Sequence, residues 1–291
     1  MTAVELTITQ TPSRRRKVSA LTLGTFILVT LVALALLAPL IFPGGPNVQQ
    51  PAARLLPPWS HDNSGAFHLL GTDGLGRDLL VRVIYGARSS LFVAAVGVAV
   101  GSAVGVVMGL IAGYYGGWSS SVIMRTADIQ LAFPYLLLAL AVVAVLGANL
   151  ANLVLVLGLT TWVSYARLIR GQVLGIRERE FVAAAKALGV SDLQIIRRHV
   201  LPHVLSPLLI ITSVEAGRLI LLEATLSFLG LGVQPPTPAW GADLAAARQY
   251  ITVAWWVGTF PGVMIVIAVL ATYLIGDGLR NRFDPWQHHA R

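Results

Sequence analysis

The sequence contains no cysteine and few charged residues. The absence of cysteine among its 291 residues excludes disulfides, thiolate metal sites and cysteine nucleophiles. Charged residues make up 12% and hydrophobic residues 56%, whereas soluble domains carry about 25% charged residues. Both lysines, Lys17 and Lys186, stand outside any Gly-x-x-x-x-Gly-Lys-Ser/Thr pattern, so the chain has no nucleotide-binding P-loop. We therefore expect an integral membrane protein that does not hydrolyse ATP itself.

Signatures of catalysis and metal binding are missing as well. Of the six histidines, only His199 and His203 are spaced as i and i+4, and Pro202 interrupts that helix face. The sequence also lacks the His-Glu-x-x-His and Gly-x-Ser-x-Gly patterns of proteases and acyl transferases. We predict that the chain is not an enzyme and binds no cofactor and no metal. Its net charge of +8 comes from arginines beside apolar segments, which favours membrane lipid over nucleic acid as the partner.

Long apolar segments predict an all-α membrane protein with six transmembrane helices. Residues 21–41 carry no charge, and as a helix they span about 31 Å, the thickness of a bilayer core. A basic stretch at 14–17 precedes them as in a signal peptide, but a signal peptide has an apolar run of only about 7–15 residues. The other expected spans lie at 91–114, in two helices within 131–165 that meet near Gly147, Asn149 and Asn152, at 203–229 and at 253–275.

Basic residues are shared unevenly between the two sides of the membrane. With a cytoplasmic N-terminus, the inner segments carry 15 Lys and Arg and the outer loops carry 5. This excess predicts that both termini are cytoplasmic. The expected division is a cytoplasmic tail at 1–20, a first helix at 21–41, an extracytoplasmic loop at 42–90, a core of five helices at 91–276 with a cytoplasmic loop at 166–203, and a cytoplasmic tail at 277–291.

Residues 180–202 form a long, basic and helix-prone segment between two spans. Gly189 supplies the left-handed position that ends one helix, and Ser191 with Gln194 predicts a Ser-x-x-Gln capping box that opens a second helix. Pro202 is expected to break or kink the second helix. We predict a compact two-helix knob on the cytoplasmic side that docks a partner. An amphipathic surface helix without a partner is the alternative.

Glycines recur every four residues along the second predicted span. Such a ridge lets a neighbouring backbone approach closely, so we expect a tight helix contact, either within the chain or with a second subunit. A high glycine content without such a contact is the alternative. The ridge consists of Gly97, Gly101, Gly105, Gly109 and Gly113.

Three charged residues lie within the fifth predicted span. Each costs about 2.5–3.5 kcal/mol at mid-bilayer, so each needs a partner or water. Glu215 and Arg218 are three residues apart on a helix and can pair, whereas Glu223 lies on the side away from Arg218. These residues, with Ser227 one turn beyond Glu223, are candidates for lining or gating a translocation path. A buried ion pair that fixes helix packing is the alternative for Glu215 and Arg218.

The knob carries the pattern of a known family. Ala184-Ala185, Gly189 and Leu201-Pro202 resemble the Glu-Ala-Ala loop of ABC-importer permeases. In that family the loop is a coupling helix that sits in a groove of a cytoplasmic ATPase. The resemblance therefore implies that the docking residues are Glu180, Phe181, Ala184, Ala185, Lys186, Leu188, Gly189, Arg197 and His199.

The sequence departs from the family pattern at a few positions. Ala183 stands where the loop has its glutamate, and Glu180, one turn earlier, can take that role. His199 occupies a position that is usually hydrophobic, His203 one that is often asparagine, and Asn281 one that is usually aspartate. These departures bear on particular docking contacts and leave the overall resemblance intact.

Further motifs in the same order resemble the C-type permease subunit of oligopeptide and dipeptide ABC importers. The resemblance covers roughly 39–286, and the sequence itself leaves open the physical role of its first motif. The motifs are Gly-Thr-Asp-Gly-Leu-Gly-Arg-Asp at 71–78, Gly-Tyr-Tyr-Gly-Gly at 113–117, Glu-Ala-Thr-Leu-Ser-Phe-Leu-Gly-Leu-Gly at 223–232 and Gly-Asp-Gly-Leu-Arg at 276–280.

The resemblance implies a type I ABC-importer permease fold in a bacterial inner membrane. The chain would form half of a permease heterodimer, with two ATPase subunits that bind ATP and Mg and with an extracytoplasmic binding protein that delivers peptides. Nickel chelates, glutathione or another small solute are the alternative substrates. The rival class is an ion-coupled secondary transporter, which should show inverted repeats that are not evident in this sequence.

Overall fold

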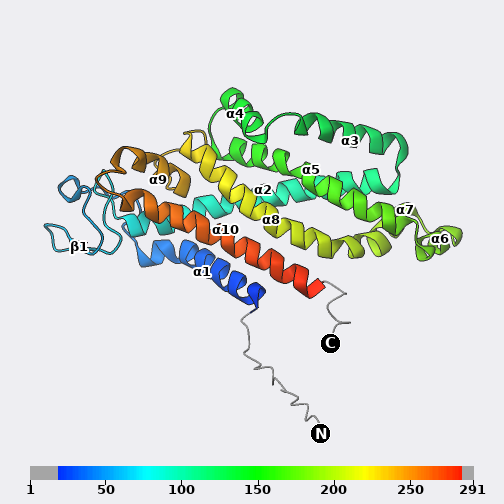
Figure 1. Ribbon diagram of the computed structural model, residues 1–291, viewed down its shortest axis with the longest axis horizontal. Coiled ribbons are helices and arrows are strands. Elements are labelled where there is room, and N and C mark those ends of the chain that lie inside the picture. The colour runs from blue at the N-terminus through cyan, green and yellow to red at the C-terminus, as the bar shows by residue number, and fades with distance from the viewer. Residues whose placement is uncertain (1–18, 284–291) are drawn as a thin grey trace, which may run out of the picture.

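The computed structural model describes residues 19–283 as an elongated bundle of long helices (Figure 1). Five helices among these residues are long and apolar enough to cross a membrane, and a bent helix pair brings the number to six if it counts as one span. The predicted all-α membrane fold is thereby confirmed. The basic stretch at 14–17 and most of the predicted C-terminal tail lie outside the described residues. The long helices are α1 (Ala20–Ile41), α2 (Leu79–Tyr114), α5 (Leu150–Arg177), α8 (Leu201–Phe228) and α10 (Trp256–Phe283).

Short elements gather at the two ends of the bundle (Figure 1). One end carries a loop cap, which we define as residues 42–78 and 229–255. In this cap β1 pairs antiparallel with β2, with Ser60 opposite His68. The other end carries the knob, formed by α6 (Glu180–Ala187) and α7 (Asp192–Ile195). The helices and strands of the loop cap are η1 (Pro51–Ala53), β1 (Ser60–His61), β2 (Phe67–His68), α9 (Trp240–Ala247) and η3 (Arg248–Tyr250).

The third span is broken, which the sequence analysis did not predict. The first helix expected within 131–165 corresponds to α4 (Tyr135–Leu146), and α3 (Gly117–Leu131) precedes it with a bend of 88° between the two. Pro134 lies at the bend. Proline has no N–H for the helix ladder and pushes the residue before it away from helical angles, so neither helix continues through residues 132–134.

The predicted glycine ridge forms the contact between α2 and α5. All five glycines are buried, and a Cβ added at Gly109 or Gly113 would lie 2.7 Å from the Cβ of Ile169 or Val173 on α5. The two helices therefore approach at backbone distance within this chain. α2 is also longer than predicted, because it begins at Leu79 and includes residues 79–90, which were expected to belong to the extracytoplasmic loop.

The second helix of the knob continues into the fifth span. The helix does not break at Pro202, because α7 passes through a π-helical turn, η2 (Ile196–Val200), into α8 (Leu201–Phe228). The wider π turn directly before Pro202 interrupts the regular α-helical ladder where a residue without an N–H enters the helix. α7, the π turn and α8 thus form one continuous helical rod from Asp192 to Phe228.

Candidate functional site

The knob is packed firmly onto the ends of three spans. α6 ends at Ala187, and Gly189 has φ +76°, which confirms the predicted left-handed turn. Val182 and Ile195 are fully buried in a cluster with side chains of α2, α5 and α8. A force applied to the knob is therefore passed directly to the spans beneath it.

Polar and aromatic contacts tie the same parts together. The Tyr114 hydroxyl at the end of α2 donates a hydrogen bond of 2.7 Å to Asp192 Oδ1. Lys186 Nζ lies 4.9 Å from the centre of the Tyr114 ring. On the other side of α6, Phe181 stacks on His203 of α8 with ring centres 5.5 Å apart. Sequence reasoning missed Tyr114 and Asp192, because their contact depends on the tertiary packing of α2 against α7.

The predicted docking residues divide between a surface and the interior of the knob. Leu188 is 83% exposed and Leu193, which sequence reasoning missed, is 64% exposed, so the knob presents large apolar side chains to its surroundings. Ala185 is buried in the packing of the knob, and His199 is half-buried. The remaining predicted docking residues are exposed, and they are Glu180, Phe181, Ala184, Lys186, Gly189 and Arg197.

A basic concavity includes Leu193 in its lining. It has a volume of about 410 Å³ and is lined by Ser191, Leu193, Gln194, Arg197 and Arg198. Such a surface combines an apolar anchor with positive charge, which suits a protein partner that has an acidic groove.

The predicted capping box does not form. Ser191 is the N-cap residue of α7 as expected, but its side chain makes no capping hydrogen bond. The hydrogen bond between Tyr114 and Asp192 anchors the start of this helix instead. Because α7 has only four residues before the π turn, a local cap contributes less to its position than this long-range contact.

Glu215 and Arg218 form the ion pair that their spacing predicted. Arg218 Nε lies 2.7 Å from Glu215 Oε2, and the Glu215 side chain is 8% exposed. The Arg218 guanidinium lies 5.8 Å from the centre of the Tyr135 ring at the start of α4. The structure therefore brings this pair together with the break in the third span.

Glu223 lies in a different place, in the interior of the bundle. It is fully buried, and its Oε1 accepts a hydrogen bond of 2.7 Å from the Ser227 hydroxyl. The Ser227 oxygen in turn accepts a hydrogen bond from the backbone N–H of Val233. Among the described residues, Glu223 Oε2 has no hydrogen-bond partner. Glu223 and Ser227 thus hold the start of the loop that follows α8.

The 71–78 motif organises the loop cap. Asp73 Oδ1 accepts hydrogen bonds from the backbone N–H groups of Leu75 and Arg77, at 2.8 and 3.0 Å, which closes a tight turn. Asp78 Oδ1 accepts the N–H of Val81 and so caps α2, while its Oδ2 lies 2.7 Å from His68 Nδ1. The motif therefore builds the turn that starts α2.

Arg82 joins this turn to the segment between α8 and α10. Its guanidinium is buried and pairs with Asp243 of α9, with Nε 3.0 Å from Oδ1, and Asp73 Oδ2 lies 3.7 Å from the same Nε. Burial raises the pKa of the Asp243 carboxyl above its ordinary value, and the positive charge of Arg82 opposes this shift. Sequence reasoning missed this pair because 161 residues separate its members.

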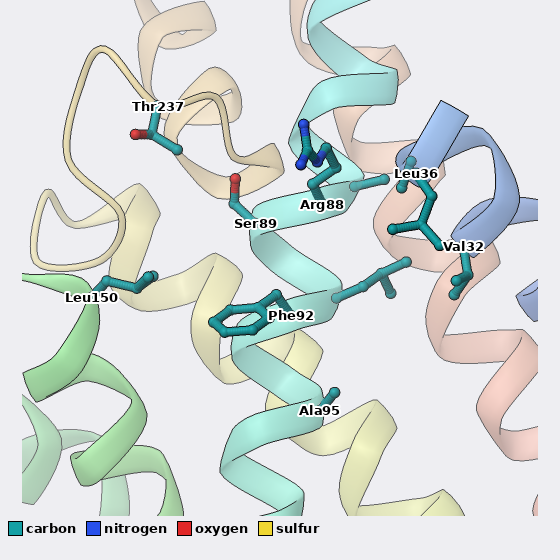
Figure 2. Close-up of a pocket in the computed structure, with 11 residues that line it drawn as sticks. Val32, Leu36, Arg88, Ser89, Phe92, Ala95, Leu150 and Thr237 are labelled. Atoms are coloured by element: carbon teal, nitrogen blue, oxygen red, sulfur yellow. The ribbon is translucent and has the colours of Figure 1, made fainter. Parts of the chain in front are cut away.

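A groove of about 440 Å³ lies between α1, α2 and the start of α5 (Figure 2). Val32 and Leu36 from α1 and Phe92 from α2 line it, and Arg88 and Ser89 lie toward one end. The described residues that line it include one cation and no carboxylate. Its chemistry suits apolar groups better than a zwitterionic peptide. Over the described part of the chain, no group of three or more His, Asp or Glu side chains is placed to hold a metal.

Comparisons with known proteins agree with this architecture. The profile of the family described as "Binding-protein-dependent transport system inner membrane component" matches residues 105–289. The chain is 41% identical to the dipeptide transport system permease protein DppC of Alkalihalophilus pseudofirmus, over 90% of this chain and 84% of that protein. It is 43% identical to the di/tripeptide transport system permease protein DppC of Pseudomonas aeruginosa, over 90% and 86%. It is 44% identical to the glutathione transport system permease protein GsiD of Escherichia coli, over 75% and 72%.

A solved structure shares the fold. A chain of the MetNI methionine ABC transporter, in an inward-facing conformation, superposes with a TM-score of 0.54 at 18% identity. The similarity covers 71% of this chain and 98% of that chain. The apolar spans, the packed knob and the family match over most of the chain lead to one conclusion. The protein belongs to the family of multi-pass inner-membrane permease components of binding-protein-dependent ABC importers.

Proposed function

We propose that this chain forms half of the translocation path of an ATP-driven importer for short peptides. The observation that carries the proposal is its similarity, over 90% of its length, to two proteins named as dipeptide and di/tripeptide permeases. Because the chain has no P-loop, ATP and Mg would bind to partner ATPase subunits. We assign this chain a non-catalytic role.

The proposed assembly contains four kinds of subunit. A homologous second permease completes the path, two ATPase subunits dock on the cytoplasmic side, and an extracytoplasmic protein delivers the peptide. The excess of basic residues in the predicted inner segments supports an orientation with the knob and both termini in the cytoplasm. The loop cap then faces the binding protein.

The knob supplies the mechanical link in this proposal. Closure of ATP-bound partners moves α6 and α7, and the continuous rod from Asp192 to Phe228 carries that movement into the spans. ATP can shift the permease between inward- and outward-open states only if the partners bind these states with different affinity. The packing of Val182 and Ile195 of the knob against α2, α5 and α8 provides the connection that such a difference requires.

The path itself is assigned to the polar face of α8. Glu215 and Arg218 are its first candidate residues, because they lie beside the break in the third span. Glu223 and Ser227 remain candidates for its outer end. In this structure they hold the loop after α8, so a role in the path requires that loop to move.

Reconstitution tests the proposed function directly. Proteoliposomes that contain this chain, its second permease and the ATPase subunits should take up labelled dialanine only when binding protein and ATP are both present. Gly189→Pro should leave membrane insertion intact but uncouple ATP hydrolysis from uptake, because proline cannot adopt φ +76° and the turn of the knob is lost. Gly171→Ala on α5 is the control, because a Cβ at this position meets open space, and it should keep uptake at the parental rate. Uptake without ATPase subunits would refute the proposal.

Glutathione transport is the second candidate function. It is favoured by the 44% identity to a protein named as a glutathione permease. The same proteoliposomes distinguish the two substrates when labelled dialanine and labelled glutathione are offered separately, each with binding protein in excess. Uptake of glutathione alone would replace the peptide assignment.

A further inference from the structure

The break between α3 and α4 lies beside a small pocket with both polar and apolar walls, which the arginine of the intramembrane ion pair helps to line. Its volume is about 220 Å³, and its lining includes Gln130, Tyr135, Ser164 and Arg218. In transporters, a helix broken inside the membrane often marks the substrate site, because the break frees helix ends to face polar groups. The pocket therefore combines a broken span with an intramembrane cation.

Arg218 is only partly satisfied in this pocket. Its Nε is occupied by Glu215, at 2.7 Å, which fixes the plane of the guanidinium. Within residues 19–283, neither terminal nitrogen has a hydrogen-bond partner, and Nη2 is buried. These two nitrogens form the edge of the guanidinium that binds a carboxylate through two parallel hydrogen bonds. Because Nη2 is buried in this structure, an anion reaches both nitrogens only after the groups that cover Nη2 move.

The other groups around the pocket also favour an anion next to Arg218. Both ends of the Gln130 amide are already bonded, to Trp162 Nε1 and to the Leu159 carbonyl oxygen, so this side chain does not compete for Arg218. α4 begins at Tyr135 with no side-chain cap, and the N–H groups of its first turn add partial positive charge next to the guanidinium. The Ser164 hydroxyl supplies a further donor at the wall.

We propose that this pocket binds the terminal carboxylate of a peptide in transit, with Arg218 as the binding residue and Glu215 as its positioning residue. The inference rests on the proposed function. The α-carboxylate is the one anionic group that all short peptides share, whatever their side chains, so a permease that accepts varied sequences can recognise it. The Tyr135 ring covers one side of the guanidinium and is 52% exposed, which leaves it free to move aside as the peptide arrives.

The absence of cysteine makes a direct binding test possible. Ser164→Cys places the only thiol of this chain at the pocket, in the assembled complex, where its rate of reaction with a maleimide reports occupancy. Dialanine should slow the reaction, and dialanine amide, which lacks the carboxylate, should not. Thr237→Cys in the groove of Figure 2 is the matched control, and neither peptide should protect it.

Neutralising the guanidinium should remove the protection. Arg218→Gln in the Ser164→Cys background should weaken the protective effect of dialanine about tenfold to a hundredfold, as expected for loss of a charge-assisted hydrogen-bonded pair. Arg88→Gln removes an exposed arginine from the groove between α1, α2 and α5, and it should leave the protection of Ser164→Cys by dialanine unchanged. Equal protection by the acid and the amide, or full protection in Arg218→Gln, would overturn the inference.

A paired variant separates carboxylate binding from helix packing. If Glu215 and Arg218 serve only as a buried ion pair, the double variant E215Q/R218Q should import dialanine as well as the parent, because no unpaired charge remains. If Arg218 binds the peptide, this variant should assemble and hydrolyse ATP but import about tenfold less peptide per ATP. If the complex imports dialanine but dialanine does not protect Ser164→Cys from the maleimide, the carboxylate site is refuted and the proposed function is not.

Discussion

Replacing Arg82 should destabilise the loop cap much more than its peripheral position suggests. The guanidinium pairs with the buried carboxylate of Asp243 and lies 3.7 Å from Asp73, while its Nη1 donates to the Pro46 carbonyl oxygen at 3.3 Å. Arg82→Gln leaves the Asp243 carboxylate buried without its cation. Removing one partner of a buried pair costs about 3–5 kcal/mol, whereas the stability of a whole domain is about 5–15 kcal/mol.

The loss in the free energy of unfolding arises because the Asp243 carboxylate remains charged and buried. A variant that also removes this charge is therefore the control. The double variant R82Q/D243N removes both charges and should recover most of the loss, to within about 1–2 kcal/mol of the parent. Arg54→Gln removes an exposed arginine from the same cap and should change the free energy of unfolding by no more than about 0.5 kcal/mol.

Tryptophan fluorescence in detergent follows the unfolding of the protein, and two of its seven tryptophans are hydrogen-bonded next to this region. Trp240 donates to the Val83 carbonyl oxygen at 2.9 Å and Trp256 to the Thr72 carbonyl oxygen at 3.2 Å, so both indoles report on the cap. Denaturant titrations then give the free energy of unfolding of each variant. An Arg82→Gln protein as stable as Arg54→Gln would refute the reasoning that this ion pair holds the cap together.

Three further predictions concern the ridge, the knob and the fifth span. Gly109→Ala should lower the free energy of unfolding by about 1–3 kcal/mol, because the new Cβ would lie 2.7 Å from a Cβ of α5, whereas Gly171→Ala has open space and should be neutral or stabilising in the same titration. Ala185→Asp should disrupt the buried packing of the knob and abolish uptake of dialanine, while Ala184→Asp, on its exposed face, should keep the knob folded and weaken ATPase binding in a pull-down. Glu223→Leu should reduce uptake more than it reduces assembly with the second permease, and uptake at the parental rate would assign Glu223 to packing alone.

Local features of the sequence were enough to predict the spans and the position of the knob. Charge-free stretches of bilayer length and the left-handed glycine at 189 depend on neighbouring residues only, and the structure bears both out. The glycine ridge was also visible, but its partner was not. The identification of α5 as that partner required the positions of Ile169 and Val173 in space.

The errors arose where direction or distant contacts decide the structure. Hydropathy measures how apolar a stretch is and ignores where its helix axis points, so it did not predict the bend of 88° next to Pro134. The capping box predicted at Ser191 does not form. The start of α7 is held instead by a hydrogen bond from Tyr114 to Asp192, which are 78 residues apart in the sequence. The 71–78 motif is linked to α9 through Arg82, which contacts both Asp73 and Asp243. The sequence does not reveal this link, because 161 residues separate Arg82 from Asp243.

The central claim is that the knob is the cytoplasmic docking point of an ATPase, and single cysteines in this cysteine-free chain test it most directly. Leu188 of the knob and Leu75 of the loop cap are both exposed, at 83% and 46%. A membrane-impermeant maleimide applied to intact cells should label Leu75→Cys and not Leu188→Cys. In inside-out vesicles it should label Leu188→Cys, and bound ATPase subunits should block that labelling. Labelling of Leu188→Cys from outside the cell, or equal labelling with and without the ATPase subunits, would contradict the account.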